Sequence, residues 1–191
     1  MSNCILVAAV QMVSGDNVQG NIERACLGIK NAAQRGAKLV VLPEYFCLLS
    51  PDDRAKLDIA ELPAGGPIQS SLSDAAKRFG VWLVGGSLPL RSDNPSKVFN
   101  TQLVFDPSGH IAARYDKIHL FNFTSQQESY RESNAVKAGH EVKTVRVTFD
   151  TGQSLHIGLS TCYDLRFPEL YRAMGAVDLV VVPAAFTATT G

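Results

Sequence analysis

Short runs of apolar residues alternate along the chain with longer segments whose apolar residues recur every three or four positions. The short runs have the length and composition of buried strands, and the longer segments have the spacing of amphipathic helices. Strands are predicted at residues 5–12, 38–42, 81–85, 98–105, 110–115, 142–149, 154–160 and 178–182. Helices are predicted to end near Gly36 and Gly80 and to begin near Pro168.

Turn sequences join two pairs of these strands into predicted hairpins. Residues 106–109 (Asp-Pro-Ser-Gly) separate one pair, and residues 150–152 (Asp-Thr-Gly) separate the other. Continuous apolar strands that alternate with helices are typical of a sheet covered by helices on at least one face. The sequence therefore predicts an α/β fold. Because no linker interrupts the chain and 46% of its 191 residues are apolar, residues 1–191 are expected to form one domain.

The charge of the chain is balanced. It has 18 basic and 18 acidic residues, and no cluster of Lys and Arg marks one segment. Binding to nucleic acid or to an anionic membrane surface is therefore not expected, and a small molecule is the expected partner. The first residues lead into a strand without a leader pattern, and no apolar run has the length of a membrane span, so a cytoplasmic protein is expected.

Four cysteines are scattered along the chain, at positions 4, 26, 47 and 162. No two of them form a C-x-x-C pair, which argues against a zinc site and against a disulfide scaffold. The glycine pairs at 65–66 and 85–86 lack the spacing of phosphate-binding loops. We therefore expect free thiols, no metal and no cofactor.

Three reactive side chains occupy equivalent places in the predicted fold. Glu44, Lys117 and Cys162 each come two residues after the end of a predicted strand. Each residue alone is more often a surface charge or an inert buried thiol. Because active sites of α/β sheets gather at the carboxyl ends of strands, the three side chains could nevertheless converge.

Cys162 has the placement of a nucleophile. A strand that runs into a sharp turn and then a helix exposes the side chain at the turn, and the next backbone N–H, from Tyr163, points to where an oxyanion would form. A free thiol with a pKa of about 8.5 is mostly protonated at neutral pH, so a thiol nucleophile needs a base beside it.

Three segments carry a family resemblance: residues 42–46 (Leu-Pro-Glu-Tyr-Phe), 115–121 (Tyr-Asp-Lys-Ile-His-Leu-Phe) and 160–170 (Ser-Thr-Cys-Tyr-Asp-Leu-Arg-Phe-Pro-Glu-Leu). In this order they resemble the signature blocks of the nitrilase superfamily, the carbon–nitrogen hydrolases. Within it, the chain looks most similar to the Nit-type amidases, which include deaminated glutathione amidases and ω-amidases. The resemblance also covers residues 99–101 and 130–133, and it implies an αββα sandwich.

The resemblance implies a catalytic Glu-Lys-Cys triad. Glu44 would be the general acid and base, Lys117 the oxyanion stabiliser and Cys162 the nucleophile. Glu132 matches a second glutamate of the family, although Glu128 lies close by on the same loop. The implied reaction is hydrolysis of a linear, non-peptide C–N amide of a small carboxylated compound, through a thioester and with release of ammonia.

Related amidases continue past the position of Gly191 into a helix and further strands. The sandwich is therefore expected to be incomplete at its C-terminus, and much of the homodimer surface of the family is expected to be missing.

Histidine is the rival base, because Cys–His pairs are common in thiol hydrolases. His156 is six residues before Cys162 on one predicted strand, hence roughly 20 Å away, which is too far for a hydrogen bond. It is expected to be a wall residue. His119 lies two positions beyond Lys117 and could reach the site, but a structural hydrogen bond is the commoner role for a loop histidine.

Arg166 has two interpretations. Its guanidinium could bind a substrate carboxylate in bidentate fashion. It could equally form an ion pair with Asp164 or Glu169 that shapes the turn after the nucleophile. Both interpretations stay open at the level of the sequence.

Two other functions compete with amide hydrolysis. A chain without the C-terminal portion of its relatives could be a non-catalytic remnant that acts as an interaction partner. An activated thiolate could also act as a redox sensor, although that role does not need Glu44 or Lys117. Amide hydrolysis is the leading hypothesis.

Overall fold

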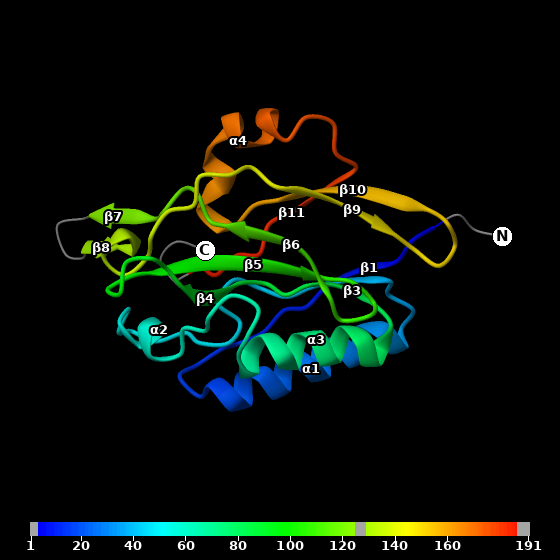
Figure 1. Cartoon of the computed structure of the whole chain (residues 1–191), viewed down its shortest axis with the longest axis horizontal. Helices are drawn as coiled ribbons and strands as arrows, with labels where there is room; N and C mark the ends of the chain where they lie inside the picture. The colour runs from blue at the N-terminus through cyan, green and yellow to red at the C-terminus, as the bar shows by residue number, and fades with distance from the viewer. Residues whose placement is uncertain (1–3, 125–128, 187–191) are drawn as a thin grey trace.

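The computed structural model describes residues 4–124 and 129–186 and has a layered architecture. Figure 1 shows a larger and a smaller sheet packed face to face, with helices on the outer side of each. Helices α1 (Val18–Gln34) and α3 (Pro67–Phe79) cover the larger sheet, and the short helix α4 (Pro168–Ala173) lies beyond the smaller sheet. The layers follow the order helix, sheet, sheet, helix, which confirms the predicted α/β sandwich.

The larger sheet combines parallel and antiparallel strands. Its order is β1-β2-β3-β5-β4, and β6 pairs with β5. Strands β1, β2 and β3 run parallel, whereas β5 runs antiparallel to β3, β4 and β6. The strands are β1 (Val7–Ala9), β2 (Leu39–Val41), β3 (Trp82–Val84), β4 (Leu88–Arg91), β5 (Val98–Phe105) and β6 (Ile111–Asp116).

The smaller sheet has the order β11-β10-β9. Strand β10 runs antiparallel to β9 and parallel to β11. Both predicted hairpins, β5–β6 and β9–β10, are confirmed. The strands of this sheet are β9 (Thr144–Thr148), β10 (Ser154–Leu159) and β11 (Leu179–Val181), and a separate ribbon consists of β7 (Asn122–Thr124) and β8 (Ser129–Arg131).

Local side-chain chemistry explains where the long helices begin and end. The Asn17 side chain accepts an N–H from the first turn of α1. The buried Glu61 carboxylate accepts the N–H groups of Ile68 (2.5 Å) and Gln69 (3.0 Å), which begin α3. Gly80 ends α3 in the left-handed region, at a φ of 62°. None of the described helices is both long and apolar enough to cross a membrane.

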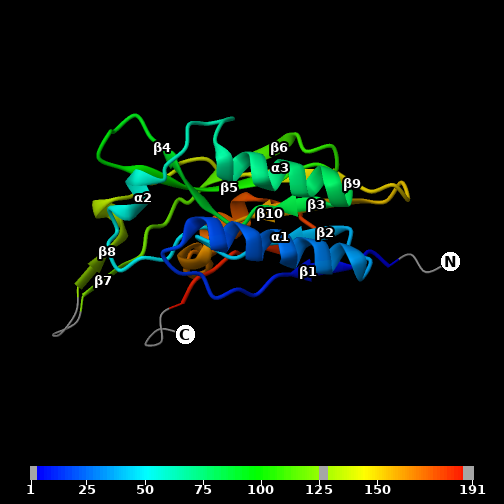
Figure 2. The same cartoon turned by 90° about the horizontal axis from the view of Figure 1, so that it is seen from below.

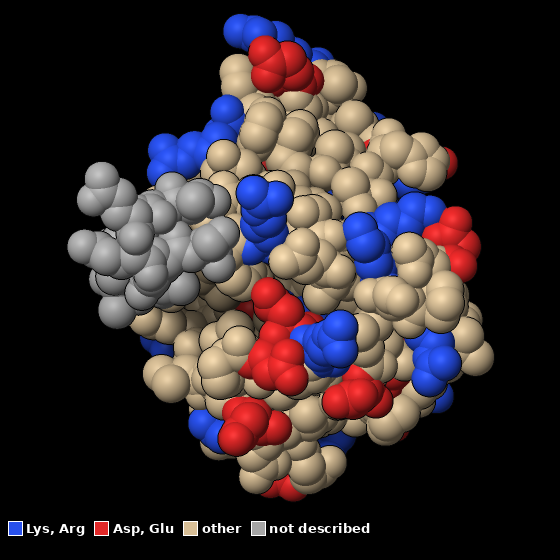
Figure 3. All heavy atoms as spheres, turned by 90° about the vertical axis from the view of Figure 1, so that its left-hand side faces the viewer, with Lys and Arg blue, Asp and Glu red and all other residues tan. Residues whose placement is uncertain are grey.

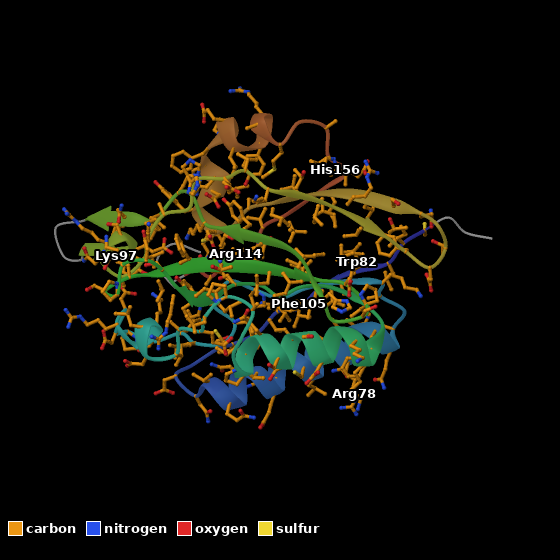
Figure 4. The ribbon with its side chains drawn as sticks, viewed as in Figure 1. Arg78, Trp82, Lys97, Phe105, Arg114 and His156 are labelled. Carbon is orange, nitrogen blue, oxygen red and sulfur yellow. The ribbon has the colours of Figure 1, made fainter. Side chains whose placement is uncertain are left out.

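Two apolar layers hold the sandwich together. One lies between the helices and the larger sheet, where Phe105 is buried (Figure 4), and Figure 2 shows α1 and α3 side by side over that sheet. The other lies between the two sheets and includes Leu39, Val104, Ile157 and Leu159. Each such side chain stabilises the fold by about 1.5–3 kcal/mol when fully buried.

Several elements differ from the prediction. Strand β1 covers only Val7–Ala9 of the predicted residues 5–12. Strand β4 was not predicted, because Pro89 interrupts its apolar run; proline is tolerated there since β4 lies at an end of the sheet order. The short helix α2 (Ala55–Asp58) and the β7–β8 ribbon were also not predicted.

Candidate active site

Glu44 is presented by a tight turn after β2. The Leu42 N–H still bonds to the sheet, at Val84 O (3.0 Å), and Tyr45 then takes a φ of 46°, in the left-handed region that non-glycine residues rarely adopt. The Tyr45 N–H bonds to Ser87 Oγ (3.0 Å). This turn directs the Glu44 carboxylate into the interior, where 4% of the side chain is exposed.

Gly86 supports this turn from the neighbouring loop. Its φ is 58°, and a Cβ on Gly86 would lie 2.1 Å from Pro43 O, directly before Glu44. Gly86→Ala is therefore expected to lower the free energy of unfolding by about 2–4 kcal/mol, through backbone strain and overlap. Urea denaturation measures this loss. Gly152→Ala is the matched control, because Gly152 has a φ of 80° but open space at its Cβ; an equal loss in both variants would contradict the packing role of Gly86.

Lys117 follows β6 and is fixed at its backbone on both sides. Its N–H bonds to Asn100 O (2.9 Å), and its carbonyl accepts the Gly139 N–H (2.8 Å). The ammonium lies 2.9 Å from Glu44 Oε1, and 3.2 and 3.0 Å from the two oxygens of Glu132. With 2%, 4% and 3% of their side chains exposed, these residues form a buried cluster of one cation and two anions.

Asn100, on β5, holds the two carboxylates of this cluster together. Its Nδ2 donates to Glu44 Oε1 (2.9 Å) and to Glu132 Oε1 (3.2 Å). The other oxygen of Glu132 accepts the Phe121 N–H (2.7 Å). Glu132 lies in the short 3₁₀ turn η1 (Glu132–Asn134), so the segment after β8 closes one side of the site.

Cys162 is the first residue of the 3₁₀ turn η2 (Cys162–Arg166), which begins after β10. Its φ is 47°, a strained conformation typical of a nucleophile held on a sharp turn. The Cys162 N–H bonds to Pro183 O (2.9 Å), and Sγ lies 3.8 Å from Ala185 O. The Ala185 N–H in turn bonds to Glu44 Oε2 (3.0 Å). The backbone of one residue thus contacts both the thiol and the carboxylate.

The charges of the cluster set the protonation of the two reactive groups. Burial alone would lower the pKa of Lys117, but Glu44 and Glu132 outweigh burial and raise it, so Lys117 is an ammonium. The pKa of Cys162 is raised to about 12, first by burial and then by the Glu44 carboxylate through its charge and as a hydrogen-bond acceptor, while the Lys117 charge opposes the shift. The resting nucleophile is therefore a thiol beside a carboxylate.

The structure brings Glu44, Lys117 and Cys162 together from three separate strand ends, as their positions in the sequence predict. Glu132 joins them, whereas Glu128 lies outside the described residues. The Tyr163 N–H lies directly after Cys162, in the first turn of η2.

Both rival histidines are engaged in hydrogen bonds with groups other than the thiol. His119 bonds to the buried Asp164 through its backbone N–H (2.9 Å) and through its ring Nδ1 (2.7 Å). This is the structural hydrogen bond expected for a loop histidine. The His156 ring bonds to Ala176 O (2.9 Å), near the loop between α4 and β11, as Figure 4 shows.

Arg166 is exposed at the end of η2. Within the described part of the chain it forms no ion pair with Asp164 or Glu169, so the second of the two interpretations, a turn-shaping ion pair, does not hold. The reason is that His119 and Tyr115 already occupy the two oxygens of Asp164. Binding of a substrate carboxylate by Arg166 stays a prediction.

Two contributors to the site, Ala185 and Asn100, were not predicted from the sequence. Ala185 contributes only backbone atoms, which any residue type could supply. Asn100 lies inside an apolar strand and its Oδ1 is buried without a partner among the described residues. Two signals point to Asn100 in the sequence: an amide inside a β-strand, since buried polar side chains are normally hydrogen-bonded, and its place within residues 99–101 of the family resemblance.

The outer surface at the end of the molecule that contains β7, β8 and α2 carries charges of both signs. Figure 3 shows this end, where Lys and Arg side chains lie beside Asp and Glu side chains among uncharged residues. On this face, the charges are mixed, as the balanced composition of the chain predicts.

Comparison with known proteins identifies the family. The sequence profile of the carbon–nitrogen hydrolases matches residues 6–189. The chain is 36% identical to the deaminated glutathione amidase of Yersinia enterocolitica, over 97% of this chain and 64% of that protein. It is also 36% identical to an omega-amidase of Homo sapiens, over 97% of this chain and 65% of that protein.

Solved structures show the same fold. A Saccharomyces cerevisiae member of the nitrilase superfamily superposes with a TM-score of 0.75 at 28% identity, over 92% of this chain and 62% of that chain. The Caenorhabditis elegans NitFhit protein superposes with a TM-score of 0.78 at 31% identity, over 96% of this chain and 44% of that chain. The chain thus spans less than two thirds of the length of these relatives, and it belongs to the carbon–nitrogen hydrolase family of the nitrilase superfamily.

Proposed function

We propose that the protein hydrolyses a linear, non-peptide C–N amide of a small carboxylated compound through a thioester on Cys162. The observation that carries the proposal is the Glu44 carboxylate, which is shared between a buried ammonium and the thiol. Its Oε1 lies 2.9 Å from Lys117 Nζ, and its Oε2 accepts the Ala185 N–H beside the thiol. Amidases among the relatives favour an amide substrate over a nitrile.

The two oxygens of Glu44 have different surroundings. Oε1 accepts hydrogen bonds from both Lys117 and Asn100, at 2.9 Å each, so its lone pairs are engaged. Oε2 accepts the Ala185 N–H (3.0 Å) and keeps a lone pair on the side of the thiol. Oε2 is therefore the oxygen that can take a proton. The Cys162 thiol lies beside it, because Sγ contacts the carbonyl of Ala185, the residue whose N–H bonds to Oε2.

The first half of the reaction forms the thioester. Glu44 removes the thiol proton as Cys162 Sγ bonds to the amide carbon, and the carbonyl electrons move to oxygen. The Lys117 ammonium and the Tyr163 N–H stabilise that oxyanion. The electrons then return, the C–N bond breaks, and the proton on Glu44 moves to the departing nitrogen, which leaves as ammonia.

The second half releases the acid. Glu44 takes a proton from water as the water oxygen bonds to the thioester carbon, and the same two donors stabilise the new oxyanion. The C–S bond then breaks, and the sulfur regains the proton from Glu44. One carboxylate thus acts alternately as base and acid, and Glu132 keeps Lys117 charged and in place.

The protonation of the resting thiol argues against the redox-sensor alternative. A sensor cysteine reacts as an exposed thiolate of low pKa. The Cys162 pKa is instead raised to about 12, first by burial and then by the charge of Glu44. Such a thiol becomes nucleophilic only when a base removes its proton during attack, which suits a hydrolase.

Ammonia release from a panel of ω-amides tests the proposal. We expect turnover by the wild type and a thioester on Cys162, seen by mass spectrometry after acid quench. Cys162→Ala should lower turnover at least about a thousandfold, because no other group replaces the nucleophile. Cys4→Ala, at an exposed cysteine, is the matched control. A folded wild type without turnover would favour the non-catalytic remnant, and turnover by Cys162→Ala would refute the thioester.

A further inference from the structure

A second polar cluster lies next to the site, and the steps above do not use it. Its centre is Asp164, a fully buried carboxylate two residues after Cys162. One oxygen accepts the backbone N–H of His119 at 2.9 Å and lies 2.7 Å from Nδ1 of the His119 ring. The other oxygen accepts the Tyr115 hydroxyl (2.7 Å) and the Thr161 N–H (2.9 Å).

These contacts join two segments that belong to different sheets. Tyr115 lies in β6 of the larger sheet, and His119 follows that strand, two residues after Lys117. Asp164 follows β10 of the smaller sheet, on the turn that carries the thiol. A single carboxylate therefore ties the segment with the ammonium to the segment with the nucleophile.

The centre of the contact between the sheets is apolar, and other hydrogen bonds between them, such as the one from Gln102 Nε2 to Ser160 O (3.2 Å), lie around that centre. The centre consists of Leu39, Val84, Val104, Ile157 and Leu159. Apolar contacts are non-directional, so they resist separation of the sheets more than a small slip of one sheet along the other. Hydrogen bonds depend on direction and distance and do resist such a slip.

The His119 ring is itself held in a fixed orientation. It stacks on Phe167 with the ring centroids 3.7 Å apart and the planes 8° from parallel. Phe167 directly follows η2, so the stack also joins the two segments. Stacking and the bond to Asp164 act together on one side chain, which leaves little freedom for the segment behind Lys117.

We propose that Asp164 and His119 are positioning residues that hold the Lys117 ammonium in register with the Cys162 thiol across the two sheets. The proposal rests on the proposed function for the roles of Lys117 and Cys162. Lys117 Nζ is bound to Glu44 and so moves with the larger sheet, whereas the thiol moves with the smaller sheet. A misplacement of about 1 Å between reacting groups lowers rates by about a hundredfold.

Alkylation of Cys162 by iodoacetamide tests the proposal without amide turnover. The rate is followed on the Cys162 peptide by mass spectrometry, from about pH 7 to about pH 10, because the rate reports the thiolate fraction. We expect His119→Ala to slow alkylation about three- to tenfold at pH 9, since a displaced cation no longer favours the thiolate. Circular dichroism checks that each variant folds.

Two matched variants show whether the hydrogen bond is responsible. His119→Asn keeps an N–H near the position of Nδ1 but has no ring to stack on Phe167, and it is expected to restore most of the rate. His110→Ala alters a histidine at the opposite end of β6, 82% exposed, and should leave the rate unchanged. Tyr115→Phe removes the hydroxyl that donates to Asp164 and should also slow alkylation. This variant tests the proposal if His119→Ala does not fold.

A double variant shows whether His119 acts through Lys117. In a Lys117→Gln background, His119→Ala should have no further effect, because the cation to be positioned is absent. Equal slowing in both backgrounds, an unchanged rate in His119→Ala, or no recovery in His119→Asn would overturn the proposal. If the wild type releases no ammonia but alkylation follows the expected pattern, the proposed function fails and the positioning role stands.

Discussion

Exchange of Lys117 for methionine is expected to remove most hydrolysis and much of the stability of the fold. The ammonium lies 2.9 Å from Glu44 and 3.0 Å from Glu132 and is 2% exposed. Without it, two buried carboxylates lack a cation, and such a loss lowers the free energy of unfolding by about 3–5 kcal/mol. Loss of an oxyanion donor lowers kcat by about a hundred- to a thousandfold. Urea denaturation and ammonia release measure the two effects.

Two further variants separate charge from shape in this prediction. Glu132→Gln in the Lys117→Met background removes one unpaired charge, so part of the stability should return while hydrolysis stays absent. Lys137→Met is the surface control: Lys137 pairs with Asp93 at 2.6 Å but is 40% exposed, so its loss should change stability by less than about 1 kcal/mol. Equal stability of Lys117→Met and the wild type would contradict the buried cluster.

The sequence predicts the triad because each member follows a strand that apolar patterning or a hairpin turn marks. The strand before Glu44 is largely buried and the strand before Cys162 is buried in its second half, so short apolar runs bounded by turn residues predict them; β6, before Lys117, is buried only at Tyr115 and is marked instead by the turn that begins its hairpin. Parallel and antiparallel strands of packed sheets then bring their ends to one place. Position along the chain places these residues at strand ends, and the resemblance of the three segments that contain them to the nitrilase superfamily supplies the roles implied for them.

Contacts between elements could not be predicted in the same way. Asp164 was considered with Arg166, two residues further along the chain, but it pairs with Tyr115 of β6 and with His119, which follows that strand. The choice depends on how the two sheets pack, and single-sequence patterns do not fix packing. The same holds for Ala185, whose backbone reaches Glu44 across the sandwich.

Local irregularity explains the elements that were not predicted. Strand β4 contains Pro89, and the short α2 and the β7–β8 ribbon are too brief for a periodic pattern. Tyr45 and Cys162 both adopt positive φ values without glycine, so composition gives no sign of the strain. Such strain occurs where surrounding structure enforces it, often at functional sites.

Glu44→Gln is expected to move two properties of Cys162 in opposite directions. The amide cannot take the thiol proton, so hydrolysis should fall by about a hundred- to ten-thousandfold. The variant also removes the negative charge that, after burial, raises the pKa of Cys162 to about 12. The thiol pKa should therefore fall, and the pH profile of iodoacetamide alkylation should shift to lower pH, whereas Lys117→Met should shift it to higher pH.

The sign of this shift decides between two roles for the carboxylate. If Glu44 only held Lys117 in place, Glu44→Gln would leave more thiolate at neutral pH, and hydrolysis would rise or stay level with it. If Glu44 is the proton acceptor and donor, hydrolysis falls although the nucleophile is more ionised, because ammonia still leaves only with a delivered proton. Asp106→Asn, at the far end of the β5–β6 hairpin, should change neither property. Parallel changes of hydrolysis and alkylation in Glu44→Gln would contradict the acid–base role.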